Sequence, residues 1–260
     1  MRRVRLIVEY DGTGYSGWQR QENAVSVQEK LEQALRKLTG EKELFVVGAS
    51  RTDAGVHALG QNVHFDTDCR IPAEKFCFAL NTLLPDDIRV RASMRVSEGF
   101  HARFSAQGKE YRYLFYASPH ASALYRNLSA HVVYPLNAEA MNEEAQDAVG
   151  THDFAPFAAS GSVVKDTVRT IDRATVFRSG DMLEMRVHGN GFLYNMVRIL
   201  AGTLIGVGSG KLERGAIRRA LQSGSRLDLG VTAPAGGLTL MRVDYPDGFV
   251  IADDEERGRA

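Results

Sequence analysis

The stretch VVGASRTDAGVHALGQNVHFD, residues 46–66, joins two apolar segments through a short polar turn. The apolar run at 44–49 and the alternating residues at 61–66 predict two strands that this turn connects. The turn contains one carboxylate, Asp53, between a basic residue and a glycine. An aspartate in such a place can be a turn former, a helix cap, a metal ligand or a nucleophile, so residues elsewhere in the chain must distinguish these roles.

Length and composition predict two domains in the cytoplasm. The chain has 260 residues, of which 44% are hydrophobic, enough for two ordinary cores. Charged residues interrupt the segment MRRVRLIVEYDG, so no apolar run there reaches the length of a signal peptide or a membrane span, and we expect no membrane contact. Cys69 and Cys77 form no CxxC pair, which favours reduced, buried thiols over a disulfide or a zinc site. We expect neither a metal nor a cofactor.

Charged residues are unevenly distributed although the net charge is zero. Residues 244–260 contain six acidic residues and two arginines, a local charge of −4, so residues 1–243 carry +4. Within that body, residues 89–113 mix six basic side chains with four aromatic rings and two glutamates. This mixture is typical of a nucleic-acid surface, but strands with solvated arginine faces look the same, so the pattern leaves both interpretations open.

Hydrophobic periodicity and turn residues predict an α+β protein. Alternating or apolar runs predict strands at 4–10, 44–49, 61–66, 88–96, 109–117, 131–134, 238–245 and on both sides of a turn within 168–188. Helical spacing, with Ser26 and Asn137 as caps, predicts helices at 27–39, 72–84, 138–149, 193–204 and 213–222. Strands joined by hairpins, with helices gathered on one side, indicate α+β rather than a doubly wound sheet.

The order of these elements divides the chain into two similar halves. Each half runs strand, helix, strands, helix, strand, although no repeated words align between them. We therefore expect two domains, 1–106 and 107–245, each an antiparallel sheet with helices on one face. The remaining residues, 246–260, are predicted to form an acidic, disordered tail.

Three short sequence motifs contain the candidate catalytic residues. In RTDAG, Asp53 lies two residues after Arg51, whose charge favours the ionised carboxylate of a nucleophile or base. The sequence contains no HExxH, GxSxG or GxxxxGK[ST] motif. In KEYRY, Tyr111 and Tyr113 share a strand face, where they can be core aromatics or a stacking platform for a base. In NMVR, Arg198 lies in a nearly uncharged helix, where it can be solvated or can pair with a buried anion such as Asp53.

Four words in order make the chain resemble one family, the TruA-type tRNA pseudouridine synthases. They are YDGTGYSGWQRQ at 10–21, GASRTDAGVHALGQ at 48–61, KEYRY at 109–113 and GFLYNMVRILAGTL at 191–204. The resemblance covers nearly the whole chain up to Tyr245. It implies two α+β domains that meet at a central basic active-site cleft. It also implies a homodimer that acts, without a cofactor, on uridines of the tRNA anticodon stem-loop at about positions 38 to 40.

The resemblance also implies a role for each candidate residue. Asp53 corresponds to the catalytic nucleophile. Tyr111 would stack on the target uracil and take part in proton transfer at C5, and Arg198 would pair with Asp53. Arg51 would help to displace the target base from its stack, and we expect His57 to contribute to substrate binding. These residue types suit a reaction that requires the base to leave the helix, because flipping needs an aromatic platform and a side chain that fills the vacancy.

The residues alone leave two other classes of function open. A non-catalytic RNA-binding module would explain the basic and aromatic strands without using Asp53. A hydrolase with an aspartate nucleophile would explain Asp53, but such enzymes usually need a second acid and a magnesium ion, and the RTDAGVHALGQ word offers no second acid.

Overall fold

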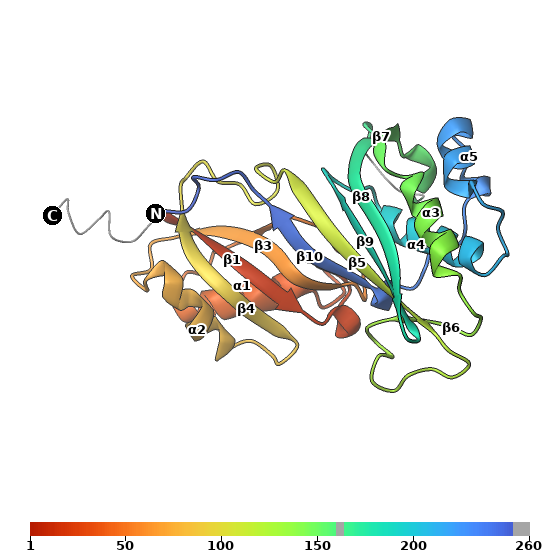
Figure 1. Cartoon of the computed structure of the whole chain (residues 1–260). Helices are drawn as coiled ribbons and strands as arrows, with labels where there is room; N and C mark the ends of the chain where they lie inside the picture. Colours follow the sequence, from red (N-terminus) through yellow and green to blue (C-terminus); the bar gives the residue numbers. More distant parts are fainter. Residues whose placement is uncertain (160–163, 252–260) are drawn as a thin grey trace. The chain divides into compact units, whose positions relative to one another are not determined.

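The computed structural model describes residues 1–159 and 164–251 (Figure 1). The chain divides into two compact units, one formed by Met1–Gln107 with the chain from Leu240 onward, and the other by Gly108–Thr239. The expected boundary at 106/107 lies one residue from this division. The last strand, which we expected in the second domain, instead lies mostly in the first unit. Each unit contains antiparallel strands and separate helices, so the predicted α+β class is confirmed.

The first unit is built on antiparallel strands. β1 (Arg2–Tyr10) lies between β4 (Ile88–Val96) and β3 (His57–Thr67), and β10 (Leu238–Asp244) is the neighbour of β3 on its other side. β2 (Val47–Gly48) also pairs with β3. Every second residue of β1 from position 4 to position 10 is buried, as the alternation predicted. The place of β10 beside β3 explains why the end of the chain belongs to this unit.

Two helices belong to this unit. α1 (Val27–Thr39) begins at Ser26, whose hydroxyl accepts from the Glu29 amide, and ends at Gly40, whose φ is 79°. These caps confirm the predicted bounds 27–39. α2 (Phe76–Asn81) is shorter than the predicted helix at 72–84, because residues 73–75 form a 3-10 turn and the backbone of Pro72 is extended at ψ 140°.

Polar side chains of β3 are buried as well as its apolar ones. Gln61, Asn62 and His64 are each less than 5% exposed. The Nδ1 atom of His64 accepts a hydrogen bond from the Ala102 amide at 3.1 Å. Burial, with the nearby charge of Arg3 and the ring of His101, lowers the pKa of His64 to about 4, so the ring is neutral at physiological pH.

The chain beyond β10 packs against β4. The amide of Ser97 donates to the Phe249 carbonyl at 2.9 Å, and the Ile251 amide donates to the Arg95 carbonyl at 3.1 Å. The Phe249 ring meets the edge of Phe100 with centroids 5.3 Å apart. The tail predicted from residue 246 therefore starts too early, because the apolar segment before the acidic residues continues the packing. The rest of that tail, 252–260, lies outside the described residues.

The second unit is also antiparallel in its main strands. β5 (Gly108–Ala117) pairs with β9 (Met182–Gly189), which pairs with β8 (Val168–Ser179), which pairs with β7 (Gly150–Asp153). β6 (Ala130–Val132) runs parallel to β5. The hairpin predicted within 168–188 is confirmed, and its turn contains a glycine with φ 62°.

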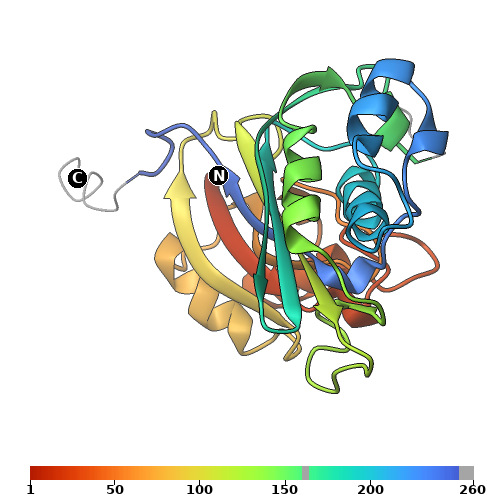
Figure 2. The same cartoon turned by 45° about the vertical axis from the view of Figure 1, so that its right-hand side comes forward.

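Three helices gather on one side of β8 in the second unit (Figure 2). They are α3 (Ala138–Gln146), α4 (Met196–Gly208) and α5 (Ala216–Ser223). The buried carboxylate of Glu144 in α3 accepts from the amides of Gly215 and Ile217 at 2.6 and 2.7 Å, and so caps α5. α5 starts later than the predicted residue 213 because Gly215, with φ 79°, cannot continue a right-handed helix.

Two smaller expectations concern thiols and membranes. Cys69 and Cys77 are free thiols, but both are partly exposed rather than buried. Among the helices of the described ranges, none has the length and apolar character needed to cross a bilayer.

Candidate active site

Asp53 lies on the loop of residues 50–56, which leads into β3. Thr52 is buried beside it, and the Thr52 hydroxyl lies 2.7 Å from the hydroxyl of Tyr10 at the end of β1. The Val56 amide donates to the Asp53 carbonyl at 3.1 Å and closes the turn. Asp53 itself is half-buried and Arg51 is exposed. The loop is therefore anchored on both sides of a carboxylate that retains access to solvent.

A second loop, residues 11–18, supports the Asp53 loop from outside. The Trp18 amide donates to the Thr52 carbonyl at 3.0 Å, and the Gly55 amide donates to the Tyr15 carbonyl at 3.3 Å. The Trp18 ring is buried and stacks on the Tyr10 ring with centroids 6.1 Å apart. These contacts explain the role of the YDGTGYSGWQRQ motif: its backbone forms hydrogen bonds with the backbone of the RTDAG motif and fixes its position.

Two glycines of the supporting loop allow this close approach. A Cβ on Gly17 would lie 2.6 Å from the Thr52 carbonyl oxygen and 3.1 Å from the Asp53 carbonyl carbon, and Gly17 has φ 90°. A Cβ on Gly12 would overlap the Val56 carbonyl. Both glycines lie in the motif at 10–21, but the sequence analysis gave them no role. Glycines in a loop can indicate that another backbone segment packs closely against it, as the Asp53 loop does here.

His57 is buried at the start of β3, with 3% of its surface exposed. Its Nδ1 atom accepts from the Gly12 amide at 3.0 Å and lies 3.1 Å from Oδ1 of Asp11. Burial acts to raise the pKa of Asp11, but hydrogen bonds from Thr13 and the neighbouring His57 outweigh it, and the net pKa is lowered. His57 therefore ties the supporting loop to β3, and its expected contact with substrate stays a prediction.

The segment that enters the loop is also fixed. The Ala49 amide donates to the Asn62 carbonyl at 2.8 Å. The side chain of Gln61 accepts from the Ser50 amide at 3.2 Å and donates to the Ser50 carbonyl at 2.6 Å. The backbone on the upstream side of Asp53 is thus held by the Asn62 carbonyl and the buried Gln61 side chain of β3, as well as by the supporting loop.

In the second unit, Tyr111 and Tyr113 lie on β5, as predicted. Tyr111 is 7% exposed and meets the Phe192 ring edge-on, with centroids 5.2 Å apart. Tyr113 is fully buried and donates its hydroxyl to the Pro234 carbonyl at 2.7 Å. Burial raises the pKa of the Tyr113 hydroxyl, and the charge of Arg198 opposes this only in part. Tyr113 is therefore a core aromatic, which leaves Tyr111 as the candidate of the pair.

Arg198 lies in the first turn of α4. Its Nη1 donates to Oδ1 of Asn195 at 2.7 Å, and its Nε donates to the Ala233 carbonyl at 2.9 Å. The Ala233 amide returns a bond to the Arg198 carbonyl at 3.0 Å. Asn195 has φ 61°, a left-handed conformation that asparagine adopts more readily than most residues other than glycine. The two hydrogen bonds made by the Arg198 guanidinium fix its plane, and sequence analysis had given Asn195 no role.

The predicted site residues are distributed over both units. The first unit carries Asp53, Arg51 and His57 within one loop and the start of β3, and the second unit carries Tyr111 and Arg198. In the two described ranges of the chain, no three His, Cys, Asp or Glu side chains are grouped as a metal site.

A family model and three curated relatives agree in the name they carry. The model of the family described as tRNA pseudouridine synthase matches residues 6–105 and 145–246. A protein of Ruminiclostridium cellulolyticum is 53% identical, over 94% of this chain and 100% of its own length. Proteins of Acetivibrio thermocellus and Bacillus subtilis are 50% and 46% identical, again over 94% of this chain and over 100% and 99% of their own lengths. All three are named tRNA pseudouridine synthase A. The family match and these identities show that the chain belongs to the tRNA pseudouridine synthase family.

Proposed function

We propose that this protein isomerises uridine to pseudouridine in the anticodon stem-loop of tRNA, at about positions 38 to 40. Membership of the family supports the reaction class. The single observation that carries the proposal is the half-buried Asp53, held at the tip of a loop whose backbone is bonded to β3 and to the supporting loop. A rigidly held carboxylate suits a nucleophile, because little conformational entropy is then lost when it reaches the geometry needed for attack.

The reaction needs no redox step or energy source. The N1–C1′ bond of the nucleotide breaks, the uracil turns, and a C5–C1′ bond forms. The proton on C5 is lost to a base and ultimately to water, and N1 gains a proton, so product and substrate have the same composition. Asp53 supplies the electron pair, either to C6 of the ring or to C1′ of the ribose, and leaves again when the new bond is made.

The other candidate residues take the roles that the family resemblance implies. We propose that Tyr111 stacks on the flipped uracil and relays the C5 proton, and that Arg198 pairs with the Asp53 carboxylate. The fixed plane of the Arg198 guanidinium supports this pairing, since a preoriented cation loses less entropy when it binds an anion. Exposed Arg51 occupies the space left by the base, and His57 contributes to substrate binding through its loop. We also propose that the protein acts in the cytoplasm as a homodimer, without a cofactor.

Release of tritium from C5 of uracil tests this proposal. Unmodified tRNA labelled at C5 should lose its label to water in chelator-containing buffer, with the RNA chain intact. Asp53→Asn should reduce the release more than tenfold and leave tRNA affinity nearly unchanged, because a nucleophile is lost but no binding surface is removed. Asp68→Asn is the matched control, since Asp68 is exposed and pairs with the amino terminus. Strand scission, or release that survives Asp53→Asn above a tenth of wild type, would overturn the proposal.

A further inference from the structure

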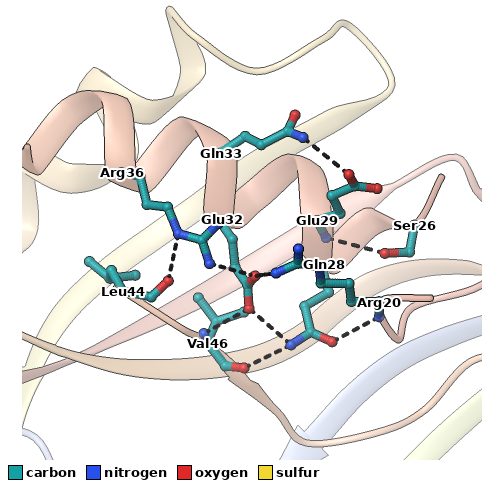
Figure 3. A network of polar contacts seen from close by, with 9 residues as sticks. All are labelled: Arg20, Ser26, Gln28, Glu29, Glu32, Gln33, Arg36, Leu44 and Val46. Atoms are coloured by element: carbon teal, nitrogen blue, oxygen red, sulfur yellow. Dashed lines mark hydrogen bonds and ion pairs between the residues drawn. The ribbon is translucent and has the colours of Figure 1, made fainter. Parts of the chain in front are cut away.

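Gln28, in the first turn of α1, joins segments that the sequence separates (Figure 3). Its side-chain Oε1 accepts from the Arg20 amide at 3.1 Å, and its Nε2 donates to the Val46 carbonyl at 3.1 Å. Its own backbone amide donates to the Trp18 carbonyl at 3.0 Å. One residue therefore bonds both the loop that supports Asp53 and the segment that enters the Asp53 loop.

Glu32 sets the orientation of the Gln28 amide. Glu32 is 1% exposed, and its Oε1 accepts from Nε2 of Gln28 at 3.1 Å and from the Val46 amide at 3.2 Å. An ionised carboxylate has no proton to donate, so the NH₂ end of Gln28 must face it and the carbonyl end must face Arg20. The guanidinium of Arg36 lies 3.1 Å from the other Glu32 oxygen and that of Arg20 lies 3.8 Å from it, which compensates the buried charge.

Two backbone routes lead from Gln28 to Asp53. Along the first, the Gln28 side chain bonds the Arg20 amide, two residues after Trp18, and the Gln28 backbone amide bonds the Trp18 carbonyl. The Trp18 amide in turn bonds the Thr52 carbonyl directly before Asp53, so loss of the Gln28 side chain acts on this route through Arg20. Along the second, Gln28 holds Val46, which continues through β2 into the Ser50 backbone bonded to β3. Both routes consist of backbone segments held at each step by hydrogen bonds, so a shift at Gln28 moves the Asp53 loop from two sides.

We propose that Gln28 is a positioning residue for the Asp53 carboxylate, with Glu32 fixing its amide. The proposal rests on the proposed function, because it assumes that Asp53 does the chemistry. Gln28 acts through the loop and does not touch the substrate. A residue that served stability alone would change the fraction of folded protein but leave the rate of folded, tRNA-bound enzyme unchanged.

The test compares Gln28→Met with Gln33→Met. Methionine keeps the length and volume of glutamine but removes the three hydrogen bonds of the side-chain amide, to Arg20, Glu32 and Val46. Gln33 is the matched control because it lies in the same helix, is exposed, and donates its side-chain amide to the Glu29 carboxylate rather than to the segments around Asp53 (Figure 3). The assay is the single-turnover rate of C5 tritium release with enzyme in saturating excess over tRNA, together with the tRNA dissociation constant.

We expect Gln28→Met to lower the single-turnover rate at least tenfold while the dissociation constant changes less than twofold, since sub-ångström misplacement of a reacting group is costly. Gln33→Met should match wild type in both. A Gln28→Met rate within twofold of wild type, or a loss found only in the dissociation constant, would overturn the proposal.

The chain's single tryptophan gives a readout that does not depend on activity. Acrylamide quenching of buried Trp18 should increase at least twofold in Gln28→Met and not in Gln33→Met, and unchanged quenching would contradict the proposal. Failure of wild type to release tritium, with quenching altered as expected, would refute the proposed function but not the loop contact. If Gln28→Met does not fold, Glu32→Gln replaces it in the test. This substitution keeps the shape of the side chain at position 32 but allows the Gln28 amide to rotate by half a turn. It should lower the single-turnover rate at least threefold, and a wild-type rate would refute the proposal.

Discussion

Replacement of Gly17 by alanine should disable the Asp53 loop from a position outside it. The new Cβ would lie 2.6 Å from the Thr52 carbonyl oxygen, whereas ordinary van der Waals contact begins at 3.4 Å. The loop or its support must therefore shift by about 0.8 Å, the difference between these distances. A misplacement of about 1 Å can cost roughly 10²-fold in rate, so we expect the single-turnover rate to fall about 10- to 100-fold.

The same substitution should also reduce stability. A Cβ at φ 90° costs about 1–2 kcal/mol in backbone strain, and overpacking against the Asp53 loop adds about 1–3 kcal/mol. Chemical denaturation should therefore show a loss of about 2–5 kcal/mol in the free energy of unfolding.

Gly40→Ala is a control that introduces the backbone strain of a Cβ at positive φ without a steric contact with the Asp53 loop. Gly40 has a similar φ of 79°, but no atom lies within 4 Å of its added Cβ, and it ends α1 away from the Asp53 loop. It should lose about 1–2 kcal/mol of stability and keep its rate within twofold of wild type. Gly14→Ala, which has neither the strain nor the contact, should match wild type in both measurements. If Gly17→Ala were no slower than Gly40→Ala at temperatures where both are folded, the supporting loop would not control Asp53.

Four further predictions concern other parts of the chain. Tyr111→Phe keeps the ring and should slow tritium release by orders of magnitude with tRNA affinity intact; greater damage from Tyr113→Phe would mean that the wrong tyrosine is assigned. Arg198→Met should slow turnover and lower the unfolding free energy by about 1–3 kcal/mol, because Asn195 loses its bond; denaturation curves equal to wild type would contradict this. The pKa of His64 is lowered from 6.5 to about 4, so the neutral ring contributes to stability above pH 6.5 and this contribution is lost as pH falls from 6.5 toward 4. His64→Asn, which keeps an acceptor, should show a flatter pH dependence in denaturation. The tRNA dissociation constant should rise steeply with salt although the net charge is zero, and a flat titration would rule out phosphate contacts by the basic body.

Local sequence patterns were enough to predict the helices and strands whose capping residues or alternation lie within the element or next to it. Ser26 and Gly40 both fix α1, and the alternation of β1 is visible within nine residues. The predicted start of α5 was wrong because nothing local distinguishes a glycine inside a helix from one that precedes it. The short strand β7 was not predicted at all, since its four residues show no periodicity and form a strand through pairing with β8.

Sequence patterns selected candidate residues but not the residues that hold them in place. Asp53 and Arg198 are unusual in their local context, whereas Tyr111 was preferred to Tyr113 through the family resemblance. Gln28 could not be selected from the sequence, because a glutamine in a helix is ordinary until its partners at Arg20 and Val46 are known. Asn195 was given no role for a similar reason, because nothing in the sequence indicates its left-handed conformation or the bond that it accepts from Arg198.

The first unit is assembled from both ends of the chain, and this affects how it forms during synthesis. The second unit, Gly108–Thr239, is continuous, so all of it is translated before the part of β10 that belongs to the first unit. At about 5–20 residues per second, translation of those 132 residues takes about 7–26 s. During that interval β3 lacks its neighbour β10, so the part of that edge that β2 does not pair with presents unpaired N–H and C=O groups. The strand that begins with His57, next to the Asp53 loop, is therefore open to mispairing until β10 is made, and a chaperone that shields it would act before translation ends.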